Sequence, residues 1–182
     1  MKELIENNKR REGPVINFSN QERLNEHINF DKIGANKIND YFWRSEIRPI
    51  QFKKSQKGTV QEKYLNKAIS LLELFRSKKL SVNEVFDLDQ FAKLMAIRAV
   101  FGSTEFDVDD MKFYYNPVSN LLEPISKEIH SEADRFVSGF NPWVFKSDNL
   151  RYPWQKAFLD LLYNDKIFYE KYLFELNNYS NK

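Results

Sequence analysis

The chain contains no cysteine and only two histidines in 182 residues. The absence of cysteine excludes disulfide bonds, thiolate zinc sites and cysteine nucleophiles, and it leaves the redox compartment open. Two histidines are too few for a histidine-rich metal site. No stretch approaches the ~18 apolar residues of a membrane-spanning helix, and the first residues lack the apolar run of a signal peptide. The sequence therefore predicts no membrane span and no export signal.

Positive and negative charges are nearly balanced. The chain has 28 Lys and Arg residues against 26 Asp and Glu residues, a formal net charge of +2. The field of the whole chain therefore offers no strong attraction to nucleic acid or to an anionic membrane, and neither is expected as a partner. With 42% hydrophobic and 15% aromatic residues, the chain can form a real core. We expect residues 1–182 to form a single unit.

Helix signals dominate the chain. Thr59 and Glu62 form a capping box before apolar residues at helical spacing, which predicts a helix over residues 59–79. Asp87 can cap a second helix, and Gly102 lies where that helix should end. Further helices are expected over residues 2–11, 154–163 and 166–178.

Strand signals lie in two places. Residues 14–18 have strand character. Residues 111–115 and 121–125 are joined by the turn sequence Asn-Pro-Val-Ser-Asn, which predicts a β-hairpin. Between residues 19 and 58 the composition predicts mainly irregular structure, and its apolar anchors are expected at Tyr41, Phe42, Trp43 and Ile47. The expected fold class is α+β, mainly α, with a short β-hairpin.

Carboxylates flank the predicted hairpin. Glu105 and Asp110 lie five residues apart in an acid-rich loop before it, and Glu128 follows it. A protein kinase also carries a catalytic Asp and a metal-binding Asn five residues apart, and a second metal ligand follows. Oxygen ligands of this kind suit Mg²⁺ or Mn²⁺. This order indicates Glu105 as a catalytic residue and Asp110 and Glu128 as metal ligands. The alternative is that these acids are simply solvated.

Four segments, which together cover about a third of the chain, extend this pattern. They are NNKRREGPVINF, VFDLDQFAKLMAIRAVFG, MKFYYNPVSNLLEPI and LLYNDKIFYEKYLFELNNYS. In that order they resemble the spore-coat CotH family of atypical protein kinases, and the third segment is the most specific. The resemblance implies the C-terminal-lobe part of a kinase-like fold, ATP with Mg²⁺ or Mn²⁺, and transfer of phosphate to Ser or Thr of a protein substrate. It also implies a place in spore coats or at the cell surface.

The chain departs from the family pattern at the site itself. Glu105 stands where family members carry a catalytic-loop Asp or a Trp-His version of that loop, Asp110 replaces an Asn, and Glu128 stands where an Asp is expected. Displacing a catalytic group by about 1 Å can slow a reaction on the order of a hundredfold. The resemblance also begins after the family's nucleotide-covering N-terminal lobe. We therefore expect little or no independent activity, with a protein substrate or the missing lobe as partner.

Two other classes of function stay open. A non-catalytic kinase-like module would bind a partner through exposed aromatic and lobe-facing surfaces. A small helical structural protein, resembling the family by accident, would lack the hairpin or separate the three acids. The basic run at residues 9–11 could meet phosphate, but it suits a helix end better. The aromatic residues Trp143, Phe145, Tyr152 and Trp154 could line a ligand groove, but they suit a satellite core better. His130 could support a metal, but an incidental loop position is favoured.

Overall fold

Helices and a small sheet make up the part of the chain that the structure describes. The computed structural model describes residues 12–19, 41–51, 53, 57–101, 111–125 and 153–180. The predicted α+β class, mainly α, is confirmed. The elements are β1 (Val15–Phe18), α4 (Tyr41–Arg44), β2 (Ile47–Pro49), α5 (Val60–Arg76), α6 (Val82–Val85), α7 (Leu88–Val100), β3 (Lys112–Asn116), β4 (Leu121–Ile125), α8 (Pro153–Tyr163) and α9 (Lys166–Ser180).

The four strands form one antiparallel sheet in the order β2-β1-β3-β4. The predicted hairpin is confirmed as β3 and β4, with Tyr114 opposite Glu123. The predicted strand at residues 14–18 is also confirmed, and it pairs with β3 by placing Ile16 opposite Phe113. The hairpin therefore forms two of the four strands of a larger sheet and is not an isolated ribbon.

Both outer edges of this sheet carry a proline. The N–H of Ile50 donates inward to the carbonyl of Val15 at 2.9 Å, so the neighbouring Pro49 faces the outer edge of β2. In β4 the carbonyl of Leu122 faces the outer edge of the sheet and accepts the backbone N–H of the residue just before α7 at 2.9 Å. Pro124 lies two residues further along β4 and faces the same edge. Neither proline has an N–H to offer to a further strand.

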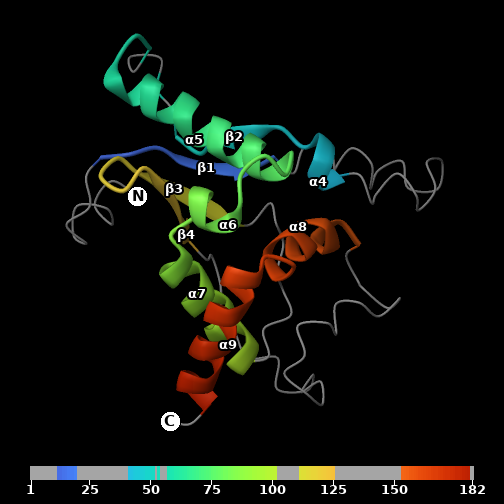
Figure 1. The fold of residues 1–182 in the computed structure, drawn as a ribbon. Helices are drawn as coiled ribbons and strands as arrows, with labels where there is room; N and C mark the ends of the chain where they lie inside the picture. Colours follow the sequence, from blue (N-terminus) through green and yellow to red (C-terminus); the bar gives the residue numbers. More distant parts are fainter. Residues whose placement is uncertain are drawn as a thin grey trace, which may run out of the picture.

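A cluster of phenylalanine rings joins the sheet to the helices. The ring of Phe158 on α8 lies at its centre and is fully buried. Its centroid lies 5.7–6.3 Å from those of Phe18, Phe42, Phe75, Phe91 and Phe113. These rings come from β1, α4, α5, α7 and β3, so one side chain contacts five elements. Figure 1 shows α5 beside the sheet and α7 and α9 extending away from it towards the C-terminus.

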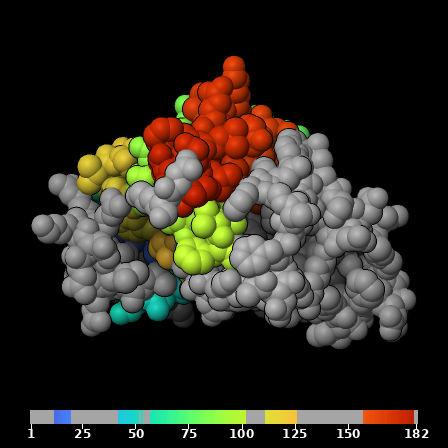
Figure 2. Space-filling view, turned by 90° about the horizontal axis from the view of Figure 1, so that it is seen from below, coloured from blue at the N-terminus to red at the C-terminus, as the bar shows by residue number. Residues whose placement is uncertain are grey.

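The helices α7 and α9 lie side by side. Phe91 and Phe168 pack with their centroids 5.6 Å apart, and Lys171 forms an ion pair of 2.7 Å with Asp89. Asp165 accepts the N–H of Phe168 at the start of α9, and its other oxygen accepts a backbone N–H at the start of α6. Figure 2 shows α9 at the surface beside the C-terminal end of α7. The two predicted closing helices are thus confirmed as α8 and α9.

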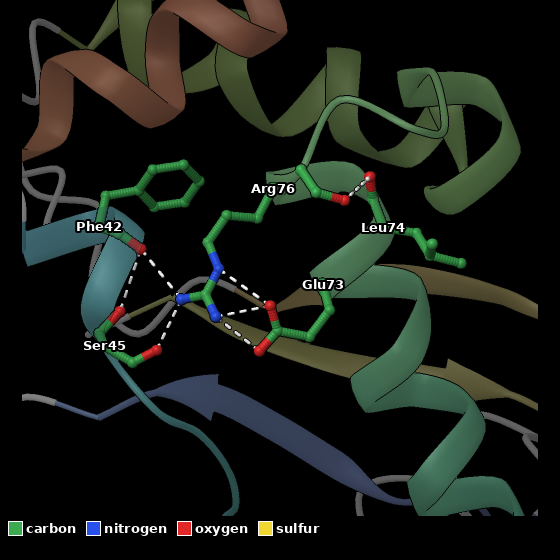
Figure 3. Close-up of polar contacts among 6 residues, drawn as sticks. Phe42, Ser45, Glu73, Leu74 and Arg76 are labelled. Carbon is green, nitrogen blue, oxygen red and sulfur yellow. Dashed lines mark hydrogen bonds and ion pairs between the residues drawn. The ribbon is translucent and has the colours of Figure 1, made fainter.

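An arginine on the last turn of α5 fixes α4 and β2. The guanidinium of Arg76 donates to the carbonyls of Phe42 and Ser45 at 3.1 and 2.6 Å (Figure 3). Its other N–H groups donate to the carboxylate of Glu73 at 2.5–3.1 Å. The five donors of the guanidinium are all used. We call this group the Arg76 clasp.

The prediction for the region before α5 was partly wrong. Residues 41–44 form a helical turn and residues 47–49 form a strand, where irregular structure was expected. Phe42 and Ile47 are buried as predicted, but Trp43 is 41% exposed. Three- and four-residue elements have almost no periodic signal, and β2 forms because β1 offers it an edge. The side chain of Tyr41 lies outside the described residues.

The capped start of α5 is confirmed, but the helix ends earlier than predicted. The hydroxyl oxygen of Thr59 accepts the N–H of Gln61 at 3.2 Å. The helix stops at Arg76 rather than near residue 79 because Lys78 adopts a left-handed conformation, with φ of 58°. Such a residue closes a helix end, and glycine usually occupies that position.

We predict that Phe158→Ala lowers the free energy of unfolding by about 3–5 kcal/mol, because it removes a ring that five other rings contact. The measurement is denaturant unfolding followed by circular dichroism. Phe174→Ala is the matched control, since Phe174 on α9 is 57% exposed, and it should change stability by less than about 0.5 kcal/mol. Equal effects of the two substitutions would contradict the central role of Phe158.

Candidate functional site

The three predicted site residues lie outside the described part of the chain. Glu105 and Asp110 fall in residues 102–110, and Glu128 falls in residues 126–152. The same holds for His130, for the aromatic side chains predicted between residues 143 and 154, for the helix at residues 2–11 and for Gly102. What the structure describes is the framework on both sides of the acid-bearing segments.

The hairpin places the two strand ends that adjoin the acid-bearing segments next to each other. Lys112 at the start of β3 lies opposite Ile125 at the end of β4. The turn, where the N–H of Asn120 donates to the carbonyl of Asn116 at 2.8 Å, closes the other end. The chain therefore enters β3 from the segment that holds Asp110, and leaves β4 towards the segment that holds Glu128, at the same open end.

The helix that precedes the acid-rich segment is tied to the same hairpin. The carboxylate of Asp87 caps α7 by accepting the N–H of Gln90 at 3.0 Å, as predicted. The N–H of Asp87 donates to the carbonyl of Leu122 in β4 at 2.9 Å. In addition, the rings of Phe91 and Phe113 lie 6.3 Å apart. The start of α7 and the hairpin are therefore held together by a backbone contact and by core packing.

Side-chain hydrogen bonds fix the turn and the register of the hairpin. The amide of Asn116 donates to the carboxylate of Glu123 at 2.7 Å, and both residues are buried. The amide oxygen of Asn116 also accepts the N–H of Val118 at 2.9 Å. The hydroxyl of Tyr115 donates to the amide oxygen of Asn120, which has a φ of 60°. A slip by one residue would break these bonds and turn the core residues outward.

A close backbone contact joins the first resembling segment to the third. The N–H of Tyr115 donates to the carbonyl of Pro14 at 2.9 Å. A Cβ atom on Gly13 would overlap with the carbonyl oxygen of Tyr115 and would lie 2.9 Å from the ring of Tyr114. Only glycine fits this position without displacing the hairpin.

The lowered pKa values of two acidic residues and the raised pKa of one tyrosine have structural causes. The hydrogen bond from the Ser81 hydroxyl lowers the pKa of Glu84 at the start of α6. The hydrogen bond from Lys171 lowers the pKa of Asp89 between α7 and α9. On α9, burial raises the pKa of Tyr172 to about 12. Helix capping and helix packing explain these shifts.

Sequence reasoning missed the surface around Trp43. It treated this residue as a core anchor, and it placed Lys78 inside a helix. The structure puts both at an open hollow next to the Arg76 clasp. The cluster of three aromatic or apolar residues in a polar region was a signal, but periodicity over four residues cannot tell which of them faces the core.

Comparisons with protein-family models, with curated proteins and with solved structures found no match to this chain. Within residues 12–19, 41–51, 53, 57–101, 111–125 and 153–180, no three His, Asp or Glu side chains lie close enough together to hold a metal ion. The helices in these ranges include none that is long and apolar enough to cross a membrane. The kinase-like interpretation therefore rests on the residues and on the framework described above.

We predict that Gly13→Ala lowers the free energy of unfolding by about 1–3 kcal/mol, because the added methyl group must displace the backbone of Tyr115. The measurement is urea unfolding at equilibrium. Val118→Ala at the tip of the same hairpin is the control, since Val118 is 65% exposed, and it should have little effect. If Gly13→Ala were neutral, the contact between residue 13 and the hairpin would not be required for folding.

Proposed function

We propose that this chain is a kinase-like module of the CotH type, which holds a divalent metal with ATP and transfers phosphate to Ser or Thr of a protein slowly or not at all by itself. Asp110 and Glu128 would hold Mg²⁺ or Mn²⁺, and Glu105 would orient the substrate hydroxyl or accept its proton. The metal would neutralise charge on the nucleotide phosphates. Because the resemblance covers only the C-terminal-lobe part of the family, full activity would depend on a nucleotide-covering lobe.

The open end of the hairpin is the observation that carries this proposal. The pairing of Lys112 with Ile125 brings together the chain segments that lead to Asp110 and Glu128. A phosphotransferase of this kind needs its metal ligands supplied from a loop before such a hairpin and from a segment after it. A structure without the hairpin would instead have favoured an accidental resemblance.

The packing of the four resembling segments gives further support. Phe18, Phe91, Phe113 and Phe168 each come from a different one of these segments. The centroids of Phe18 and Phe113 lie 6.5 Å apart, those of Phe91 and Phe113 6.3 Å, and those of Phe91 and Phe168 5.6 Å. Segments far apart in the sequence thus share one core, as expected if they form one structural unit.

We predict that MgATP, at about ten times its dissociation constant, raises the melting temperature by about 3–5 °C. Asp110→Ala and Glu128→Ala should abolish this shift, because each removes an oxygen ligand from the metal. The measurement is thermal unfolding with Mg²⁺ alone, ATP alone and both together. Transfer of labelled phosphate from ATP to a generic protein substrate should be weak in the same preparation.

Glu170→Gln is the matched control, because Glu170 is an exposed acid on α9 that forms only a long ion pair of 3.8 Å with Lys166 in the described part of the chain. This variant should keep the full MgATP shift. The absence of any shift with the unaltered chain, or an equal loss in Glu170→Gln, would refute the metal–nucleotide proposal. A melting temperature measured without ligand shows whether each variant is folded.

A non-catalytic binding module is the second candidate, and the exposed Trp43 favours it. Trp43 stands at the rim of an open hollow rather than in the core. Tryptophan and arginine are the residues most enriched at the centres of protein interfaces. Binding of a protein without phosphate transfer would satisfy this candidate.

A further inference from the structure

An open hollow lies beside the end of α5. It has a volume of about 490 Å³, and among the residues that the structure describes it is lined by Trp43, Glu73, Arg76, Ser77 and Lys78. All five belong to well-defined elements or to the turn that follows α5. The hollow is wide open to solvent, whereas small-molecule sites usually enclose most of their ligand. Its shape therefore suits a protruding side chain of another polypeptide better than an enclosed small molecule.

Arg76, which lines the hollow, already has hydrogen-bond acceptors for its guanidinium. The Arg76 clasp uses the guanidinium donors on Glu73 and on the carbonyls of Phe42 and Ser45 (Figure 3). Arg76 and Glu73 neutralise one another, and the clasp holds them in place. Neither residue is therefore expected to supply the charge that a partner would recognise.

Trp43 forms a fixed apolar wall. Its ring packs edge-on against Phe42, with the centroids 4.9 Å apart, and Phe42 is fully buried against Phe18 and Phe158. The core thus anchors the tryptophan while 41% of its surface remains exposed. A rigid, partly exposed tryptophan can bury a large apolar area on binding with little loss of side-chain freedom.

Lys78 supplies the excess charge of the hollow. Its ammonium lies 5.8 Å from the centroid of the Trp43 ring. Among the residues that the structure describes, no carboxylate forms an ion pair with it, so the lining has a net charge of +1: Arg76 and Lys78 against Glu73. Its backbone is left-handed, with φ of 58°, a conformation that favours glycine.

We infer that this hollow is a docking point for a partner polypeptide that places an apolar side chain against Trp43 and an adjacent carboxylate at Lys78. The apolar wall and the Lys78 ammonium are complementary to such an acidic, apolar segment. This inference does not depend on phosphate transfer. It gives the non-catalytic candidate its kind of partner and its site.

The test uses a fluorescein-labelled, blocked heptapeptide with a central leucine flanked by aspartates, and fluorescence polarisation with the full chain. We expect saturable binding. Trp43→Ala should weaken it at least tenfold, because it removes the apolar wall. Lys78→Gly should weaken it about fivefold, as expected for one exposed ion pair. Lys79→Ala is the control, since Lys79 is an exposed neighbour outside the lining, and it should bind normally.

Two further measurements test whether weaker binding comes from a loss of stability, and whether the charge at residue 78 selects the charge of the peptide. Lys78→Gly should keep or raise the melting temperature, because glycine adopts the left-handed conformation without strain, so weaker binding cannot come from unfolding. Lys78→Glu should lose the aspartate peptide and bind the same peptide with lysines in place of the aspartates.

Three results would overturn the inference. They are no binding of the aspartate peptide at millimolar concentration, equal binding by Lys78→Gly and Lys79→Ala, and binding of ATP rather than peptide that is lost in Trp43→Ala. The last result would assign the hollow to a nucleotide. A nucleotide shift that is lost in Glu128→Ala but kept in Trp43→Ala would instead belong to the hairpin end.

Discussion

The ring of Phe158 is the constraint on which the rest of the fold depends. It contacts rings from β1, α4 and α5, which precede α7 in the sequence, and rings from α7 and β3. Each buried aromatic side chain removes on the order of 150–250 Å² from water, so this cluster is the main apolar contribution that holds sheet and helices together. The hairpin takes its position from this cluster, because Phe113 is one of its members.

Polar contacts then set the orientation of the helices and strands, which apolar packing alone does not determine. Arg76 donates to one carbonyl in α4 and to one just after it, Asp165 accepts N–H groups at the starts of α6 and α9, and Asp87 links α7 to β4. Leaving such buried backbone groups without partners would cost about 1–3 kcal/mol each. These links set the orientation of the elements, and they explain why charged residues stand so close to an aromatic core.

The long elements could be predicted from the sequence because their signals are local. Capping by Thr59 and Asp87, helical spacing of apolar residues and the Asn-Pro turn each lie within one element. The pairing of β1 with β3, the strand β2 and the exposure of Trp43 depend on neighbours distant in sequence, so no local pattern shows them. The early end of α5 depends on one backbone conformation at Lys78. For the candidate site, the sequence predicted the acids and the hairpin. The structure confirms the hairpin, while the placing of Glu105, Asp110 and Glu128 stays a prediction.

The two edge prolines limit how this molecule can join another. Pro49 and Pro124 stand where an added strand would need a backbone N–H, so the sheet is a poor template for strand exchange or fibril-like stacking. An additional lobe or a partner would have to be recognised by side chains, as at an ordinary protein surface. Such an interface is specific for the side chains of its partner, whereas backbone pairing alone can bind almost any extended chain.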